Sequence, residues 1–121
     1  MVRPSCPALV IHAPDEFRKS LIATLDARHF TVTFVSDNER ALELLRKRDF
    51  RVVIIGINIA KGDGVPLLDT VREARDRTKC GVILLGDPDP QVRTFAPWAD
   101  ETLLKPVDAA YVAQRANSYC D

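Results

Sequence analysis

The stretch Arg51-Val-Val-Ile-Ile-Gly56 decides the fold. Its residues 52–55 form an unbroken β-branched run without polar alternation, which is typical of a strand in a parallel sheet with both faces covered. We therefore predict a central strand that ends at Gly56 and enters a loop containing Gly62 and Gly64. In an open parallel sheet, ligands bind at the carboxyl ends of the strands. Glycine at this end provides no side chain to act as nucleophile, acid, base or ligand.

Composition indicates one soluble globular domain spanning 1–121, with 46% hydrophobic residues. Seventeen basic and seventeen acidic side chains cancel, so we expect no direct nucleic acid partner and no membrane partner. No apolar stretch is long enough to span a membrane and no secretory signal is recognisable, so we expect a cytoplasmic location. The three cysteines, Cys6, Cys80 and Cys120, are odd in number and widely spaced, which favours plain thiols over a disulfide framework or a zinc site.

Further apolar runs predict strands at 8–11, 31–35, 81–85 and 102–104. Between them the apolar residues recur with helical spacing. Helices are predicted from 15 to about 28, from a capping box at Ser36-Asp-Asn-Glu39, from 65 to about 77, at 91–96 before Pro97, and after a cap at Asp108. Their apolar positions are Phe17, Leu21, Leu25, Ala41, Leu42, Leu44, Leu45, Val65, Leu68, Val71, Val112, Ala113 and Ala116.

The alternation of strand and helix, repeated five times, predicts an α/β fold with a parallel sheet and helices on both sides. The chain also resembles the receiver domain of bacterial two-component response regulators over nearly its whole length. The resemblance rests on the helix start Pro14-Asp-Glu-Phe-Arg18, the loop ending Lys61-Gly-Asp-Gly64, and the segment Ala99-Asp-Glu-Thr-Leu-Leu-Lys-Pro106. It implies a doubly wound, flavodoxin-like five-stranded sheet in the order 2-1-3-4-5.

The resemblance also implies which positions of the phosphorylation site are altered. Gly56 takes the place of the phosphoacceptor aspartate, and His12 and Ala13 take the places of two magnesium-binding acids. Oxygen ligands suit magnesium and imidazole does not, so we expect neither a metal nor a cofactor. The degenerate phosphorylation-site positions are His12, Ala13, Gly56, Asn58, Gly86, Thr102 and Lys105, of which only Lys105 keeps the residue of the chemical set.

Each of these residues also has a structural interpretation. Lys105 would grip a phosphoryl group in the family, but here a pairing with Asp15 or Asp87, or exposure to solvent, is favoured. His12 is interpreted as a hydrogen-bonded histidine at a strand end, with a protonation sensor or a phosphoryl acceptor as alternatives. A cis peptide bond before Pro106 would preserve the turn. Asp63 and Asp87 lie in predicted turns, where Asp bonds its own backbone.

By the same resemblance, the face made by the fourth helix, fifth strand and fifth helix contacts partners. It would carry the aromatic residues Phe95, Trp98, Tyr111 and Tyr119, for which interface and core packing remain alternatives.

The predicted function is a pseudo-receiver: a signalling module of two-component phosphorelay type that acts through protein contacts without phosphorylation. Its partner would be another protein, a fused output domain, or a second copy bound through this face. The alternative is a sensor of a small ligand or anion, bound in the emptied crevice at the strand ends. No catalytic motif indicates an enzyme.

Overall fold

A computed structural model describes residues 5–56, 64–88 and 95–120, with all of their side chains except those of 64–66 and 68. The strands are β1 (Cys6–Ile11), β2 (Phe30–Val35), β3 (Val52–Gly56), β4 (Gly81–Gly86) and β5 (Glu101–Leu104). The helices are α1 (Glu16–Ala27), α2 (Asn38–Lys47), α4 (Gly64–Thr78), the 3₁₀ turn η1 (Ala96–Trp98) and α6 (Ala109–Asn117).

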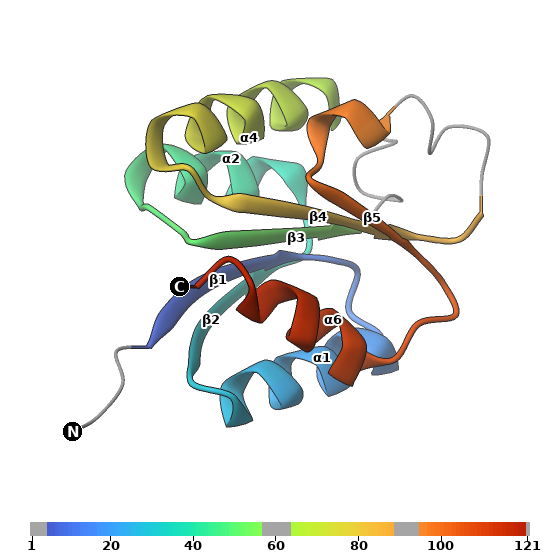
Figure 1. Ribbon diagram of the computed structural model, residues 1–121. Coiled ribbons are helices and arrows are strands. Elements are labelled where there is room, and N and C mark those ends of the chain that lie inside the picture. Colours follow the sequence, from blue (N-terminus) through green and yellow to red (C-terminus); the bar gives the residue numbers. More distant parts are fainter. Residues whose placement is uncertain (1–4, 57–63, 89–94, 121) are drawn as a thin grey trace.

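The five strands form one parallel sheet in the order β2-β1-β3-β4-β5. Helices α2 and α4 cover one face, and α1 and α6 cover the other (Figure 1). The predicted fold class and strand order are therefore confirmed. The predicted loop 57–63, which includes Asn58, Lys61 and Asp63, lies outside the described residues.

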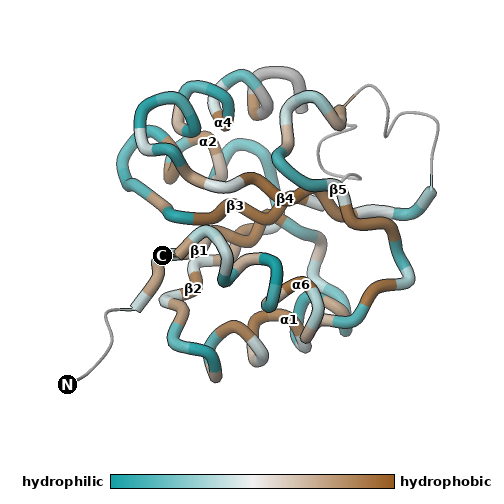
Figure 2. Tube along the Cα trace, in the orientation of Figure 1, coloured by the Kyte–Doolittle hydropathy of each residue, from teal (hydrophilic) through white to brown (hydrophobic). Residues whose placement is uncertain are grey.

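The core lies on both faces of the sheet because alternate strand residues point to opposite sides. In β1, Leu9 and Ile11 belong to the cluster under α2 and α4, and Ala8 and Val10 belong to the cluster under α1 and α6. All residues of β3 are buried, as expected for the central strand. Figure 2 shows the apolar colour concentrated along β3 and β4 and polar colour on the outer sides of the helices.

Most of the predicted buried helix positions are confirmed. Leu21 and Leu25 of α1 are fully buried, and each such side chain contributes about 2 kcal/mol by leaving water. Val112, Ala113 and Ala116 give α6 its buried face, and Ala41 and Leu45 do the same for α2. In α4, Val71 is buried as predicted, and Leu67 is buried as well. The side chains of Val65 and Leu68 are outside the description.

The capping prediction at Ser36 is wrong by one residue. The carboxylate of Asp37 caps α2 by accepting the Arg40 backbone N–H at 2.8 Å. A carboxylate at this position satisfies a free amide and faces the positive end of the helix dipole. The Ser36 hydroxyl instead accepts a hydrogen bond from Arg18 Nη1 at 2.7 Å.

Two other helix ends also differ from the prediction. Asp108 occupies the N-cap of α6, but its side chain makes no capping hydrogen bond there. Pro97 lies inside η1 and does not simply end a helix, because proline is tolerated in a first turn where no amide bond is lost. Positions 91–94 of the predicted helix fall outside the described residues.

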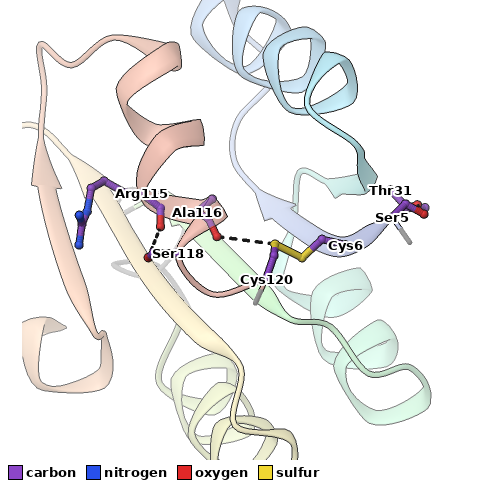
Figure 3. The surroundings of a disulfide bond; sticks show 7 residues. All are labelled: Ser5, Cys6, Thr31, Arg115, Ala116, Ser118 and Cys120. Atoms are coloured by element: carbon purple, nitrogen blue, oxygen red, sulfur yellow. Dashed lines mark hydrogen bonds between the residues drawn. A yellow bond between two sulfur atoms is a disulfide. The ribbon is translucent and has the colours of Figure 1, made fainter. Parts of the chain in front are cut away.

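The prediction of three plain thiols is wrong for two of them. Cys6 and Cys120 form a disulfide with a Cα–Cα distance of 5.8 Å, across a sequence separation of 114 (Figure 3). Only Cys80 is free, and it is buried. Wide spacing in the sequence is a poor guide here, because the fold brings the start of β1 beside the end of α6.

None of the helices in the described ranges is sufficiently long and apolar to cross a lipid bilayer.

Candidate functional site

The register of the sheet brings the predicted site positions to one edge. Ile11 pairs with Val35 and Ile55, Gly56 with Leu85, and Gly86 with Leu104. Because the strands are parallel, their carboxyl ends meet at this edge. His12, Gly56, Gly86 and Lys105 therefore all lie at or directly after the ends of neighbouring strands.

His12 is buried and makes two polar contacts. Its Nδ1 lies 2.9 Å from the Ala13 carbonyl oxygen, and its Nε2 lies 2.9 Å from Lys105 Nζ. A lysine ammonium can only donate, so Nε2 accepts and the proton sits on Nδ1, where it is donated to Ala13. The carboxylate of Asp15 is farther away, at 3.7 Å from Nδ1. The contacts thus fit a neutral imidazole, and the predicted hydrogen-bonded histidine at a strand end is confirmed.

Lys105 is held by groups that the sequence did not indicate. Its Nζ contacts His12 and also lies 4.6 Å from the centroid of the Phe17 ring, a distance at which a cation is attracted to an aromatic face. Its backbone N–H donates to the Gly86 carbonyl at 2.7 Å. Within the described ranges Lys105 forms no ion pair with Asp15 or Asp87, so that expectation is wrong. The peptide bond between Lys105 and Pro106 is cis, as predicted.

Gly56 faces the ring of His12. A Cβ built on Gly56 would lie 3.0 Å from His12 Cδ2 and 3.5 Å from both His12 Cγ and the Ile11 carbonyl oxygen. Because interiors are close-packed, a 3.0 Å carbon contact requires the ring to move. A side chain at position 56 therefore needs the imidazole to shift slightly.

The other predicted positions are less closely connected to this cluster. Ala13 is exposed, Thr102 is partly buried in β5, and Gly86 is buried at the end of β4. Asn58 lies outside the described residues. Among the residues that the structure describes, no group of three or more His, Cys, Asp or Glu side chains could hold a metal ion.

A family model described as the response regulator receiver domain matches residues 8–117. The chain belongs to this family. The receiver is 27% identical, over 95% of its length, to the transcriptional activator protein PfeR of Pseudomonas aeruginosa, and 21% identical, over 91%, to the transcriptional regulatory protein SrrA of Staphylococcus aureus. It covers 38% and 46% of those two proteins, so it spans less than half the length of these curated relatives.

Solved structures show the same fold. The receiver domain of a sensor histidine kinase from Pseudomonas aeruginosa PAO1, with a magnesium ion in its active site cleft, matches with a TM-score of 0.81 at 16% identity, covering 96% of this chain and 98% of that one. The chemotaxis response regulator CheY4 of Vibrio cholerae matches with a TM-score of 0.78 at 20% identity, covering 95% and 98%. At these identities the likeness concerns the fold.

Arg18 lies beside the site and makes contacts that the sequence did not predict. Its Nη1 donates to the His12 carbonyl at 3.1 Å and to the Ser36 hydroxyl at 2.7 Å, and its guanidinium lies 5.1 Å from the centroid of the Phe34 ring. It therefore ties the end of β1 to the end of β2. An arginine on a helix face carries no sequence signal for such a role.

The four aromatic residues predicted for the partner face do not form one exposed cluster. Phe95 is buried in the core under α2 and α4, and Trp98 packs against the same core with its indole Nε1 buried and unpaired. Tyr119 packs against the other core. Tyr111 is 47% exposed. Phe95 is therefore a core residue and not part of an exposed partner face, because its ring is buried.

Tyr119 belongs to a second polar network that the sequence did not reveal. Its hydroxyl donates to Glu101 Oε2 at 2.7 Å, and Arg115 Nε donates to Glu101 Oε1 at 2.6 Å. Burial and the hydrogen bond to Glu101 raise the pKa of the Tyr119 hydroxyl. A Cβ at Gly81 would overlap with the Tyr119 ring. The end of α6 is thereby attached to both β4 and β5.

Proposed function

We propose that this receiver is a pseudo-receiver that signals without being phosphorylated. The observation that carries the proposal is the packing of His12 against Gly56, with Lys105 bound to the same imidazole. By the family resemblance, Gly56 stands where the phosphoacceptor aspartate would be. A glycine offers no carboxylate, so no acyl phosphate forms there.

The neighbouring groups support the same conclusion. A magnesium ion prefers oxygen ligands, whereas the position after β1 carries a buried imidazole whose Nε2 already accepts a hydrogen bond from Lys105. The lysine that would grip a phosphoryl group is thus occupied within the protein. The phosphoacceptor and the metal acids are replaced, and the retained Lys105 is bound to His12, which favours a scaffold over a weakened phosphotransfer site.

The proposed mode of action is contact with another protein, a fused output domain or a second copy of the chain, in the cytoplasm and without catalysis. Tyr111 is exposed on α6, and Trp98 in η1 is partly exposed. Aromatic side chains are enriched in interface hot spots. A relative named as a transcriptional activator supports a role in a regulatory protein, with DNA contacts left to a part other than this domain.

Sensing of a small ligand or anion is the less well supported alternative. It needs His12 and Lys105 to be available at the crevice. His12 is buried, and the two side chains contact each other. Since a ligand that binds only the folded state raises its stability by mass action, a rise in melting temperature with a metabolite or an inorganic anion would favour this alternative.

The proposal is tested by intact-protein mass after incubation with acetyl phosphate and magnesium. The unmodified chain should gain no phosphoryl mass. A variant carrying His12→Asp together with Gly56→Asp supplies a carboxylate at each position and removes the obstructing ring, so it is the matched comparison. A labile, magnesium-dependent phosphoryl adduct on the unmodified chain would overturn the proposal.

A further inference from the structure

The Cys6–Cys120 disulfide joins the first strand of the sheet to the end of the last helix. Figure 3 shows the two sulfur atoms bridging the start of β1 and the turn that follows α6. Both ends pack against the core under α1 and α6. The bond therefore fixes the turn that follows α6 to the start of β1.

The two sulfur atoms differ in accessibility. Cys6 is 9% exposed and lies within the core, whereas Cys120 is only partly buried. Thiol–disulfide exchange requires a thiolate to reach one sulfur of the bond. Attack from solvent is consequently directed to Cys120 Sγ, with the Cys6 sulfur as the leaving group.

Apart from the disulfide and the Tyr119 side chain, which donates to Glu101 and packs against Gly81, the segment 118–120 is held by short-range contacts. The backbone N–H groups of Ser118, Tyr119 and Cys120 donate to Arg115, Ala116 and Asn117 carbonyls at 3.1–3.2 Å. Cys120 Sγ lies 3.8 Å from the Ala116 carbonyl oxygen, and the Ser118 hydroxyl donates to the Arg115 carbonyl at 2.7 Å (Figure 3). Turn contacts of this kind open more readily than a packed core.

The elements that the bond joins also have contacts of their own. Cys6 is fixed by its pairing with Phe30 in β2 and by its N–H, which donates to the His29 carbonyl at 3.0 Å. Helix α6 is anchored by the fully buried side chains Ala113 and Ala116. A reduced Cys6 thiol remains compatible with its site, because a free cysteine packs as a small apolar residue.

We propose that the Cys6–Cys120 disulfide is a redox-controlled latch, opened by a dithiol, that sets the freedom of the chain at the end of α6. A disulfide in a cytoplasmic protein is usually transient and redox-sensing, so the cytoplasmic location proposed above favours a bond that cycles. The latch acts on the turn that follows α6. The exchange itself does not depend on the proposed function.

The exchange balances with a dithiol as the only reductant. One thiolate of the dithiol attacks Cys120 Sγ, a mixed disulfide forms, and the Cys6 sulfur leaves and takes up a proton. The second thiolate of the dithiol then attacks the other sulfur of the same dithiol, which is bonded to Cys120 Sγ. The dithiol closes into a cyclic disulfide, and the Cys120 thiolate is released and takes up a proton. Two electrons pass from the dithiol to the bond, and the oxidised dithiol reverses the reaction.

The test equilibrates the chain with reduced and oxidised dithiothreitol and follows amide hydrogen exchange by NMR. Reduction should lower the protection of the Cys120 amide by about tenfold or more. The β3 amides should lose protection only in step with the lower free energy of unfolding and stay protected, because the reduced domain remains folded. Cys120→Ser should reproduce the reduced pattern under oxidising conditions. Cys80→Ser, which changes the one free cysteine, should leave the redox response intact.

Three results would overturn the proposal. Alkylation of both cysteines in the oxidised buffer would show that the bond does not form. Equal protection of the Cys120 amide in both buffers would show that the bond does not restrain the turn after α6. Complete loss of protection throughout β3 on reduction would show that the domain unfolds, so that the bond is a structural cross-link and no latch. Each result leaves the phosphorylation test above unaffected, because that test reads a gain of phosphoryl mass, which does not depend on the state of the two cysteines.

Discussion

Substitution of Gly56 by alanine tests the steric coupling between Gly56 and His12. The new methyl carbon would lie 3.0 Å from His12 Cδ2. The ring cannot turn away freely, since Ala13 and Lys105 hold its two nitrogen atoms and the Phe17 ring lies 5.7 Å from it between centroids. We therefore expect Gly56→Ala to destabilise the domain.

The expected size of the effect follows from two opposing contributions. An extra methyl group in a well-packed core costs about 1–3 kcal/mol. Loss of glycine flexibility in the unfolded chain offsets about 0.4–1 kcal/mol of this. The net decrease in the free energy of unfolding should be about 1–2 kcal/mol at Gly56, which is at the end of the fully buried strand β3.

The assay is urea unfolding followed by the fluorescence of Trp98, the single tryptophan of the chain. With an m-value of about 2 kcal/mol/M, the middle of the usual range for urea, the midpoint should fall by about 0.5–1 M. In a His12→Ala background the ring is absent, so Gly56→Ala should become neutral or stabilising. The coupling energy between the two sites should then be about 1–3 kcal/mol, within the range of contacting residues. Equal costs with and without His12 would refute the reasoning.

Three further outcomes follow from the structure. Replacing Cys6 and Cys120 together by serine should lower the free energy of unfolding by about 5 kcal/mol, because the bond closes a loop across a separation of 114 residues; an unchanged urea midpoint would contradict this. Burial and the Glu101 hydrogen bond raise the pKa of Tyr119, so above the ordinary tyrosine value of about 10 the unfolded chain loses a proton that the folded chain keeps. The free energy of unfolding should therefore fall as pH rises from about 10, less so in Tyr119→Phe, and equal slopes for the two proteins would count against this. Burial also raises the pKa of the Cys80 thiol, so it should react with a thiol reagent only after unfolding, whereas rapid reaction of the native protein would show that Cys80 is accessible.

The sequence predicted the sheet well because its strands carry a strong signal. The run at 52–55 is buried on both sides and has no polar alternation, so only a central strand accommodates it. The apolar positions of α6 were predicted for the same reason, since Val112, Ala113 and Ala116 share one helical face. The hydrogen-bonded state of His12 could be anticipated because a histidine at a buried strand end requires polar partners.

What the sequence did not reveal depends on contacts between distant residues. The partner of Lys105 is His12, 93 residues away, and no local pattern favours it over Asp15 or Asp87. The Cys6–Cys120 bond depends likewise on the fold bringing two ends of the chain together. At the start of α2, Ser36 and Asp37 are both good N-caps, and the choice is made by Arg18, which binds the Ser36 hydroxyl.

The central claim, that this receiver cannot use a phosphoryl group, is tested most directly with beryllofluoride. In the presence of magnesium, this anion would report an acceptor carboxylate and a metal site together. Amide chemical shifts of Gly56, Gly86 and Lys105, which lie at the same edge of the sheet, should not change when magnesium and beryllofluoride are added. Saturable shifts at these three amides that require both magnesium and beryllofluoride would contradict the account.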